Sequence, residues 1–338
     1  MSGFRLCLKK NLLELKFKKF KKYKNDFLYL LILAFIFIST SAMVISKNLP
    51  IIVKAITIPT EAPKIFPPNP VLGASTSFPV FSAEGVLAVD LDSGVTLYEK
   101  NPDTPLLPAS TTKIVTALVA LDTYKLDDVL TVGKGVAVDG QKMGLFVGEQ
   151  MTFENLLNAL LVYSANDSAE VLAQDYCAPQ SLGEVGSGAC GYDAFIAAMN
   201  RKAAELSMIN THFENPVGLD GVSQRSTARD LIRASEVAMR NPVFAKIVGT
   251  KEVTVTDITG KNKYDLKNVN ELLGQVPGVM GVKTGWTANA RENLVTYIER
   301  GGHRVMIALL GSQDRFGETK ELIDWIFGNY DWQEVKAP

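Results

Sequence analysis

The sequence predicts an α+β fold, in which strands from both ends of the folded part share one antiparallel sheet and helices lie between them. The early strands form a predicted β-hairpin over 86–98 that turns at Asp92-Ser93-Gly94. The late strand patterns lie at 251–257, 278–284, 292–299 and 303–311. Because strands and helices occur in separate blocks, and no nucleotide-binding glycine loop is present, the pattern favours α+β over a parallel α/β sheet.

Three segments precede the predicted domain, which spans 81–331. Residues 1–26 hold one arginine and eight lysines against two acids, and 27–45 carry no charge. This predicts a cytoplasmic basic segment at 1–26 and a transmembrane signal-anchor at 27–46, which makes the chain a single-pass cell-membrane protein with its domain outside the cytoplasm. A signal peptide cleaved near 39–42 is the alternative. Seven prolines in 47–80 predict an extended extracytoplasmic linker.

Composition argues against several kinds of site. The chain has 338 residues and a formal net charge of −1, which gives no reason to expect a nucleic-acid partner. Its two histidines, His212 and His303, have dissimilar surroundings and offer little material for a Ser-His-Asp enzyme or a multi-histidine zinc site. We therefore expect neither a metal nor a cofactor.

Two cysteines follow the predicted membrane span. Cys177 and Cys190 bracket a segment rich in glycine and serine, which is typical of a loop. An even pair outside the cytoplasm predicts a disulfide that closes this loop and stabilises the fold by about 3 kcal/mol in the chain-entropy picture. Two free thiols are the alternative.

The remaining elements follow in chain order. A short strand is expected at 129–132, and Thr152 is the expected N-cap of a helix over 153–163. Asp167 and Glu170 predict a capping box at the start of the next helix. Further helices are predicted over 192–206, 227–240 and 318–327. These helices fill the block between the two groups of strands and close the chain.

One predicted helix carries reactive groups at its start. Residues 114–121 are apolar on nearly every side, which is typical of a buried helix. Ser110 lies at its N-terminus and Lys113 one turn further on, on the same face. A desolvated lysine has a lowered pKa and, when neutral, can take a proton from a serine. The pair is thus a candidate nucleophile with its base, although a helix start with a solvated lysine explains these two residues equally well.

Two further polar groups are candidates for the same site. Ser164 and Asn166 lie at a junction of two predicted helices, where they could also be simple capping groups. Lys283-Thr284-Gly285 lies in a predicted strand, where the lysine could also protect a sheet edge. Gly285 would let another backbone or a ligand approach closely. Neither group identifies a site by itself.

Together the three groups form the series Ser-x-x-Lys, Ser-x-Asn and Lys-Thr-Gly, which is the motif set of penicillin-recognising serine enzymes. The surroundings strengthen the match, namely 109–113, 143–145, 215–221 and 268–273. Over roughly 80–330 the chain resembles serine-type D-alanyl-D-alanine carboxypeptidases, the low-molecular-mass penicillin-binding proteins. The resemblance implies the penicillin-binding and β-lactamase-like transpeptidase fold, with an antiparallel sheet flanked by helices and a helical subdomain.

The resemblance also implies a role for each residue. Ser110 is the expected nucleophile, Lys113 its base, and Ser164 a proton relay to the leaving amine. The backbone N–H groups of Ser110 and Trp286 would form the oxyanion hole. The expected substrate-binding residues are Asn166, Lys283, Thr284 and Gly285. The implied partners are peptidoglycan stem peptides, from which the terminal D-alanine is removed, and β-lactams, which acylate the serine.

The sequence departs from the resemblance at two points. Arg291 follows Ala290 where relatives usually carry glycine, so a charged side chain is expected near the rim of the site. We expect no counterpart of the C-terminal β-rich domain and anchor helix of many relatives, and we expect the N-terminal span to replace the anchor. Three alternatives stay open: a D,D-endopeptidase, a class A-like β-lactamase, and a non-catalytic peptidoglycan-binding module. Against the β-lactamase, the second motif reads Ser-Ala-Asn and no convincing glutamate follows Asn166.

Overall fold

A computed structural model describes residues 67–73, 77–177 and 188–335. The predicted basic segment 1–26, the predicted span 27–46 and most of the predicted linker 47–80 lie outside these described residues. Within the described ranges, no helix has the length and apolar character needed to cross a bilayer.

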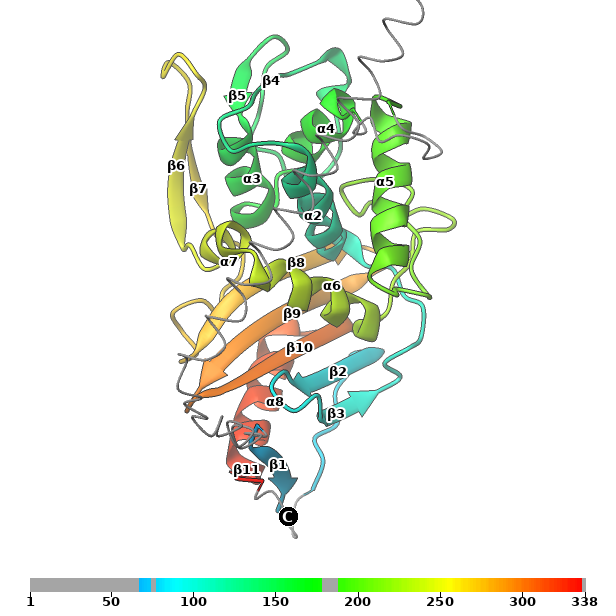
Figure 1. The fold of residues 1–338 in the computed structure, drawn as a ribbon, viewed down its shortest axis with the longest axis vertical. Helices are drawn as coiled ribbons and strands as arrows, with labels where there is room; N and C mark the ends of the chain where they lie inside the picture. The colour runs from blue at the N-terminus through cyan, green and yellow to red at the C-terminus, as the bar shows by residue number, and fades with distance from the viewer. Residues whose placement is uncertain (1–66, 74–76, 178–187, 336–338) are drawn as a thin grey trace, which may run out of the picture. The chain divides into compact units, whose positions relative to one another are not determined.

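The core of the domain is a five-stranded antiparallel sheet that joins the two ends of the folded chain, as the sequence predicted (Figure 1). In spatial order its strands are β3 (Thr96–Lys100), β2 (Gly85–Asp90), β10 (His303–Ser312), β9 (Arg291–Arg300) and β8 (Val279–Thr287). The fold is therefore α+β, with β8 at one edge of the sheet.

Helices cover both faces of this sheet. Helix α8 (Arg315–Asn329) packs on β9 and β10, where Leu322, Ile323 and Ile326 are fully buried. Helix α6 (Ala228–Arg240) crosses the opposite face, in front of the sheet in Figure 1. The alternation of apolar strand residues thus supplies two separate hydrophobic cores, one on each side of the sheet.

A helical subdomain sits above α6 and the β8 edge (Figure 1). Its helices are α2 (Lys113–Thr123), α3 (Phe153–Val162), α4 (Asn166–Asp175), α5 (Tyr192–Glu205) and α7 (Pro242–Val248). Two small sheets accompany them, formed by β4 (Val129–Thr131) with β5 (Gln150–Thr152) and by β6 (Glu252–Thr256) with β7 (Lys263–Lys267). The 3₁₀ turns are η1 (Ala109–Thr112) and η2 (Lys134–Val136). Helix α7 and strands β5 and β7 were not expected from the sequence.

The N-termini of two neighbouring helices test the capping predictions. Thr152 caps α3, since its hydroxyl accepts the N–H of Asn155, as predicted. The capping box at Asp167 and Glu170 is wrong: Ala165 is the N-cap of α4, and no side chain caps that helix. The reason is that the Asp167 carboxylate accepts N–H groups from residues 143–145, a separate segment.

A further pair of strands extends the folded part beyond its expected limits. Strand β1 (Asn69–Leu72) pairs antiparallel with β11 (Tyr330–Gln333), so that Asn69 lies opposite Gln333. This pairing brings residues of the segment 47–80, which the sequence predicted as an extended linker, into the domain. A four-residue strand whose partner is at the other end of the chain leaves no local pattern to predict it.

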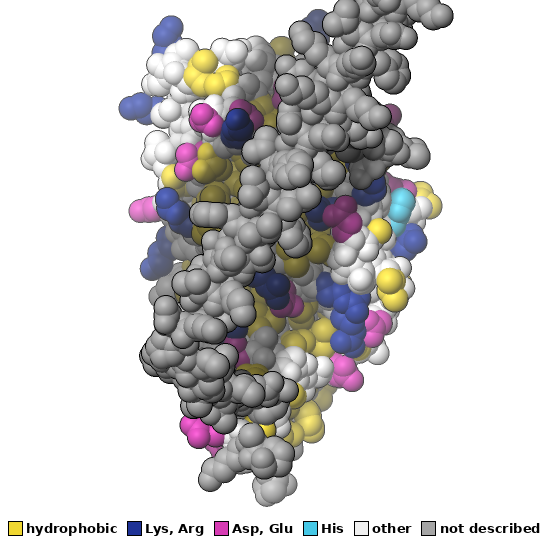
Figure 2. All heavy atoms as spheres, viewed as in Figure 1, with side chains coloured by type: hydrophobic (Ala, Val, Ile, Leu, Met, Phe, Trp, Pro, Cys, Tyr) yellow, Lys and Arg dark blue, Asp and Glu magenta, His cyan; other side chains and the backbone are white. Residues whose placement is uncertain are grey.

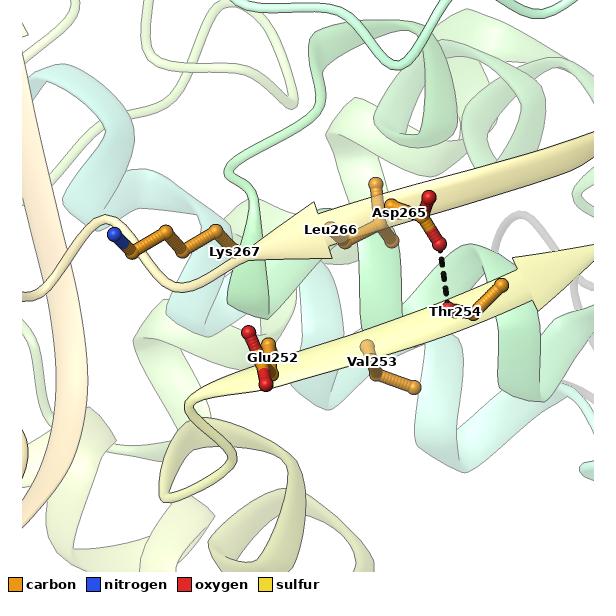
Figure 3. Close-up of a pocket in the computed structure, with 6 residues that line it drawn as sticks. All are labelled: Glu252, Val253, Thr254, Asp265, Leu266 and Lys267. Atoms are coloured by element: carbon orange, nitrogen blue, oxygen red, sulfur yellow. Dashed lines mark hydrogen bonds between the residues drawn. The ribbon is translucent and has the colours of Figure 1, made fainter.

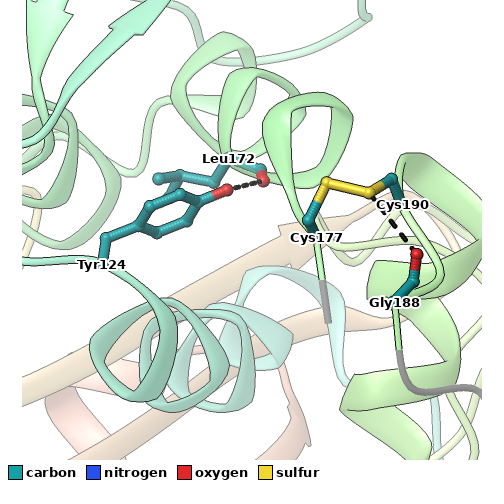
Figure 4. Close-up of a disulfide and its surroundings, with 5 residues drawn as sticks. All are labelled: Tyr124, Leu172, Cys177, Gly188 and Cys190. Atoms are coloured by element: carbon teal, nitrogen blue, oxygen red, sulfur yellow. Dashed lines mark hydrogen bonds between the residues drawn. A yellow bond between two sulfur atoms is a disulfide. The ribbon is translucent and has the colours of Figure 1, made fainter. Parts of the chain in front are cut away.

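The predicted disulfide between Cys177 and Cys190 is confirmed (Figure 4). It follows the end of α4, close to the point where the Tyr124 hydroxyl donates to the carbonyl of Leu172.

The surface shown in Figure 2 carries cationic and anionic side chains interspersed, in keeping with the near-zero net charge.

Candidate active site

Ser110 lies in η1, the single turn that leads into α2. Residues Lys113 to Ala120 of that helix are all buried, which confirms the predicted buried helix. Ala109 adopts a φ of +47°, a left-handed conformation that costs energy in a residue other than glycine. The turn is therefore held by its surroundings, and it presents Ser110 at the mouth of the helix.

Lys113 is completely buried and contacts the serine directly. Its Nζ lies 2.8 Å from Ser110 Oγ, 2.6 Å from Asn166 Oδ1 and 2.8 Å from the carbonyl oxygen of Val217. The last two atoms can only accept, so they take two N–H groups of the amine. When Lys113 is neutral, its lone pair is left to receive the proton of Ser110.

The surroundings of Lys113 favour the neutral amine. Burial, followed by the positive charge of Lys283, holds the pKa of Lys113 well below its usual range. The negative charges of Asp167 and Glu170 act in the opposite direction but are the smaller effects. A lysine in this environment can serve as a general base near neutral pH.

A second serine and lysine face the first pair. Ser164 occupies the turn between α3 and α4 with a φ of +63°, and its Oγ lies 2.9 Å from Nζ of Lys283 in β8. Lys283 also donates to the carbonyl of Thr284 at 2.9 Å. Burial and then the charge of Arg315 lower the pKa of Lys283 to about 7. The Ser164 hydroxyl thus contacts an amine, that of Lys283, which can gain or lose a proton near neutral pH.

Two glycines let three backbone segments meet beside Ser110. A Cβ on Gly285 would lie 3.0 Å from the backbone nitrogen of Ser110, so β8 passes directly against η1. On the other side, a Cβ on Gly218 would overlap the carbonyl oxygen of Ala109. The backbone after Gly285 therefore brings Trp286 next to Ser110, as an oxyanion hole requires.

These residues surround one cavity of about 510 Å³. Its walls include Ser110, Ser164, Asn166, Thr284, Gly285 and Trp286, all predicted from the sequence. Lys113 and Lys283 are buried behind the serines they contact. The fold therefore brings the three predicted motifs together from three separate elements, η1–α2, the α3–α4 turn and β8.

The sequence reasoning missed one cation in the cavity, Arg315, the first residue of α8. Its Nη1 donates to the carbonyl of Gly285 at 3.0 Å, and its buried Nε has no partner among the described residues. Burial lowers the pKa of Arg315, and the negative charge of Glu292 acts in the opposite direction but is the smaller effect. The helix predicted here began at residue 318, so Arg315 fell outside it, and no sequence pattern pointed to its place in the cavity.

Arg291 was expected near the rim of the site, and it pairs across the β8–β9 ladder with Thr287, which lines the cavity. It adopts a φ of +58°, which explains why glycine suits this position in relatives. Its guanidinium pairs with Glu84 at 3.2 Å and is not among the residues that line the cavity.

Another hollow, of about 380 Å³, lies on the β6–β7 hairpin (Figure 3). It is lined by cross-strand pairs such as Glu252 with Lys267 and Thr254 with Asp265, the latter joined by a hydrogen bond of 2.6 Å. It holds no serine or cysteine nucleophile, so the cavity at Ser110 is the candidate active site.

Known proteins match this chain over the region that carries the site. The family described as D-alanyl-D-alanine carboxypeptidase matches residues 73–314. The D-alanyl-D-alanine carboxypeptidase DacB2 of Mycobacterium tuberculosis is 37% identical over 264 residues, 75% of this chain and 85% of that protein. DacF of Bacillus subtilis is 31% identical, and the match covers 77% of this chain and 66% of that protein.

Solved structures agree. The Streptomyces K15 DD-transpeptidase is 33% identical, with a TM-score of 0.68, and the match covers 75% of this chain and 100% of that one. A D-alanyl-D-alanine carboxypeptidase structure from Mycobacterium tuberculosis is 34% identical with the same TM-score and covers 79% of this chain and 100% of its own.

Proposed function

Since this chain belongs to the D-alanyl-D-alanine carboxypeptidase family and is a serine-type enzyme of that activity, we propose that Ser110 removes the terminal D-alanine from peptidoglycan stem peptides through an acyl-enzyme. The observation that carries this assignment is the contact of 2.8 Å between a fully buried lysine and Ser110 Oγ. Burial supplies the lowered pKa that a lysine base needs.

Acylation begins when Ser110 Oγ attacks the carbonyl carbon between the two D-alanines and Lys113 takes the hydroxyl proton. The negative charge that develops on the carbonyl oxygen meets the backbone N–H groups of Ser110 and Trp286. The C–N bond then breaks, and the leaving amine takes a proton through Ser164, which Lys283 can resupply across 2.9 Å. Water subsequently hydrolyses the ester and frees Ser110.

The substrate is held from two sides. Asn166 is close enough to the cavity to hydrogen-bond the peptide backbone, and Lys283 and Thr284 lie where the terminal carboxylate would bind. Arg315 also lines the cavity and brings a second cation to it, beside Gly285, whose carbonyl accepts its Nη1–H. A carboxylate that meets a desolvated cation forms a strong, charge-assisted hydrogen bond.

Product analysis and mass spectrometry test this function. A pentapeptide stem ending in D-Ala-D-Ala should release free D-alanine, and penicillin should add its mass to the peptide that contains Ser110. A substrate with a C-terminal amide should react at least about tenfold more slowly, because it loses the charge-assisted contact with Thr284 and Arg315. Cleavage of crosslinked but not linear peptides would instead indicate an endopeptidase, and rapid penicillin turnover a β-lactamase; absence of any adduct would leave a binding module.

We also propose that residues 27–46 anchor the domain on the outer side of the cell membrane. The charge-free run and the basic residues before it support this orientation. Protease added to intact spheroplasts should digest the domain and leave a membrane-bound fragment containing residues 1–46. Recovery of a soluble domain that lacks this segment would show cleavage instead.

A further inference from the structure

One side of the active-site cavity is formed by residues 139–149, which we call the pocket wall. Gly140 and Gln141 line the cavity. Asn166 is attached to this wall at two points: its N–H donates to the carbonyl of Gln141 at 2.7 Å, and its Nδ2 donates to that of Asp139 at 2.5 Å. The other end of the same amide contacts Nζ of Lys113 at 2.6 Å. The position of the wall therefore sets the position of Asn166.

A buried carboxylate holds the middle of the wall. Asp167 is 2% exposed, and its Oδ2 accepts the N–H groups of Gly144 and Leu145 at 2.8 and 3.1 Å. Its Oδ1 accepts the N–H groups of Met143 and Ser168 at 3.2 and 3.0 Å. One carboxylate thus gathers three consecutive N–H groups of the wall and ties them to the first turn of α4, directly beside Asn166.

A second buried carboxylate holds the far end of the wall. Glu149 accepts the N–H of Phe146 at 3.0 Å within the wall. It also accepts the hydroxyl of Tyr264, at 2.8 and 2.9 Å to its two oxygens, and the side-chain amide of Asn262 at 3.1 Å. Both donors belong to the β6–β7 hairpin, so the hairpin is bonded directly to the far end of the wall.

Neither carboxylate is used in the reaction described above. Removing a carboxylate from water is unfavourable unless donors replace the water. Here all of the donors belong to the wall or to the elements on either side of it, so both charges act on the placement of a single segment. That arrangement makes the wall rigid where it meets Asn166.

We propose that Asp167 and Glu149 are positioning residues for acylation: they fix the pocket wall so that Asn166 holds Lys113 and the substrate in register with Ser110. The proposal rests on the proposed function of Ser110. It assigns the β6–β7 hairpin a part in catalysis although the hairpin does not line the cavity.

The first test is Asp167→Asn. The asparagine turns an NH₂ group toward backbone N–H donors, so part of the wall is released while the volume is kept. We expect the second-order rate constant for acylation by penicillin to fall by about tenfold or more. The acid limb of the pH profile should also move to lower pH, because the Asp167 charge raises the pKa of Lys113.

The matched control is Asp230→Asn. Asp230 is 1% exposed, lies in the first turn of α6 and accepts the N–H of Asn210 and the hydroxyl of Thr211, so it also ties a loop to a helix. It should lose similar thermal stability but acylate at the wild-type rate with an unshifted pH profile. If the two variants acylate equally at equal folded fraction, the role of Asp167 is overturned.

The second test removes no charge. Tyr264→Phe deletes the hydroxyl that holds Glu149, and we expect acylation to slow by about threefold to tenfold with unchanged pH dependence. Thr254→Val is the control, since it removes a hydrogen bond from the outer face of the same hairpin (Figure 3). Equal rates for these two variants would overturn the role of Glu149. A wild-type enzyme that penicillin does not acylate would contradict the proposed function itself.

Discussion

Replacing Lys113 by Gln is expected to slow acylation of Ser110 by about 10³-fold, whether the acyl donor is penicillin or a stem peptide. Glutamine fills similar space and can still donate to Asn166 Oδ1 or to the carbonyl of Val217. The amide nitrogen of glutamine is not basic, so it cannot take the Ser110 proton as the lysine amine, 2.8 Å from Oγ, can. The rate of adduct formation, followed by intact-protein mass spectrometry, measures the loss; a decrease of less than tenfold would exclude Lys113 as the base.

The pH dependence of the wild-type enzyme gives the matching control. Acylation requires neutral Lys113, so its rate should rise as the pH rises through the pKa of that lysine. Below about pH 7 Lys283 is charged, and its charge lowers the pKa of Lys113. Lys283→Gln removes this charge, so the acid limb should move to higher pH, opposite to the shift expected for Asp167→Asn. If the acid limb of the Lys283→Gln profile stays at the wild-type pH, the group that titrates there is not Lys113.

Replacing Gly218 by Ala should lower the acylation rate by about 10²-fold. The added Cβ would overlap the carbonyl oxygen of Ala109, the residue before the nucleophile. To relieve the overlap, the peptide between Ala109 and Ser110 must rotate or shift, and this peptide carries one of the two N–H groups of the proposed oxyanion hole. Because Gly218 has a φ of +87°, part of the effect could come from backbone strain alone.

Gly94→Ala separates strain from overlap. Gly94 has a φ of +74°, but a Cβ there would meet nothing within 4 Å, and it lies in the turn between β2 and β3. This variant should lose stability and keep its acylation rate. Should Gly218→Ala acylate as fast as Gly94→Ala, the carbonyl of Ala109 would not be what positions the oxyanion hole.

The motifs were predictable because each is a short, local pattern. Ser110 and Lys113 are one helical turn apart, and a helix that is apolar on all sides is predicted to be buried. The central sheet strands were predictable for the same reason, since each contains a short apolar run that is visible within ten residues. In contrast, the start of α4 was misassigned because the Asp167 carboxylate accepts N–H groups of a separate segment. The start of α8 was placed too late because Asp314, which caps the helix through the N–H of Gly317, was overlooked.

What the sequence could not show depends on contacts between distant segments. Arg315 reaches Gly285 across 30 residues of chain, and Tyr264 reaches Glu149 across 115. Neither contact leaves a trace in composition or spacing, because any exposed arginine or tyrosine would have the same local pattern. The chemistry of the site was therefore readable from the sequence, whereas the parts that position it required the fold.

The pairing of β1 with β11 also fixes where the first described strand joins the rest of the domain. The chain enters at Asn69, opposite Gln333, and β11 continues directly from the C-terminal end of α8. The first residue of that helix, Arg315, is in the cavity, and fifteen residues of helix span about 22 Å. Helix α8 thus acts as a spacer of fixed length between the β1–β11 pair and the cavity that Ser110 lines.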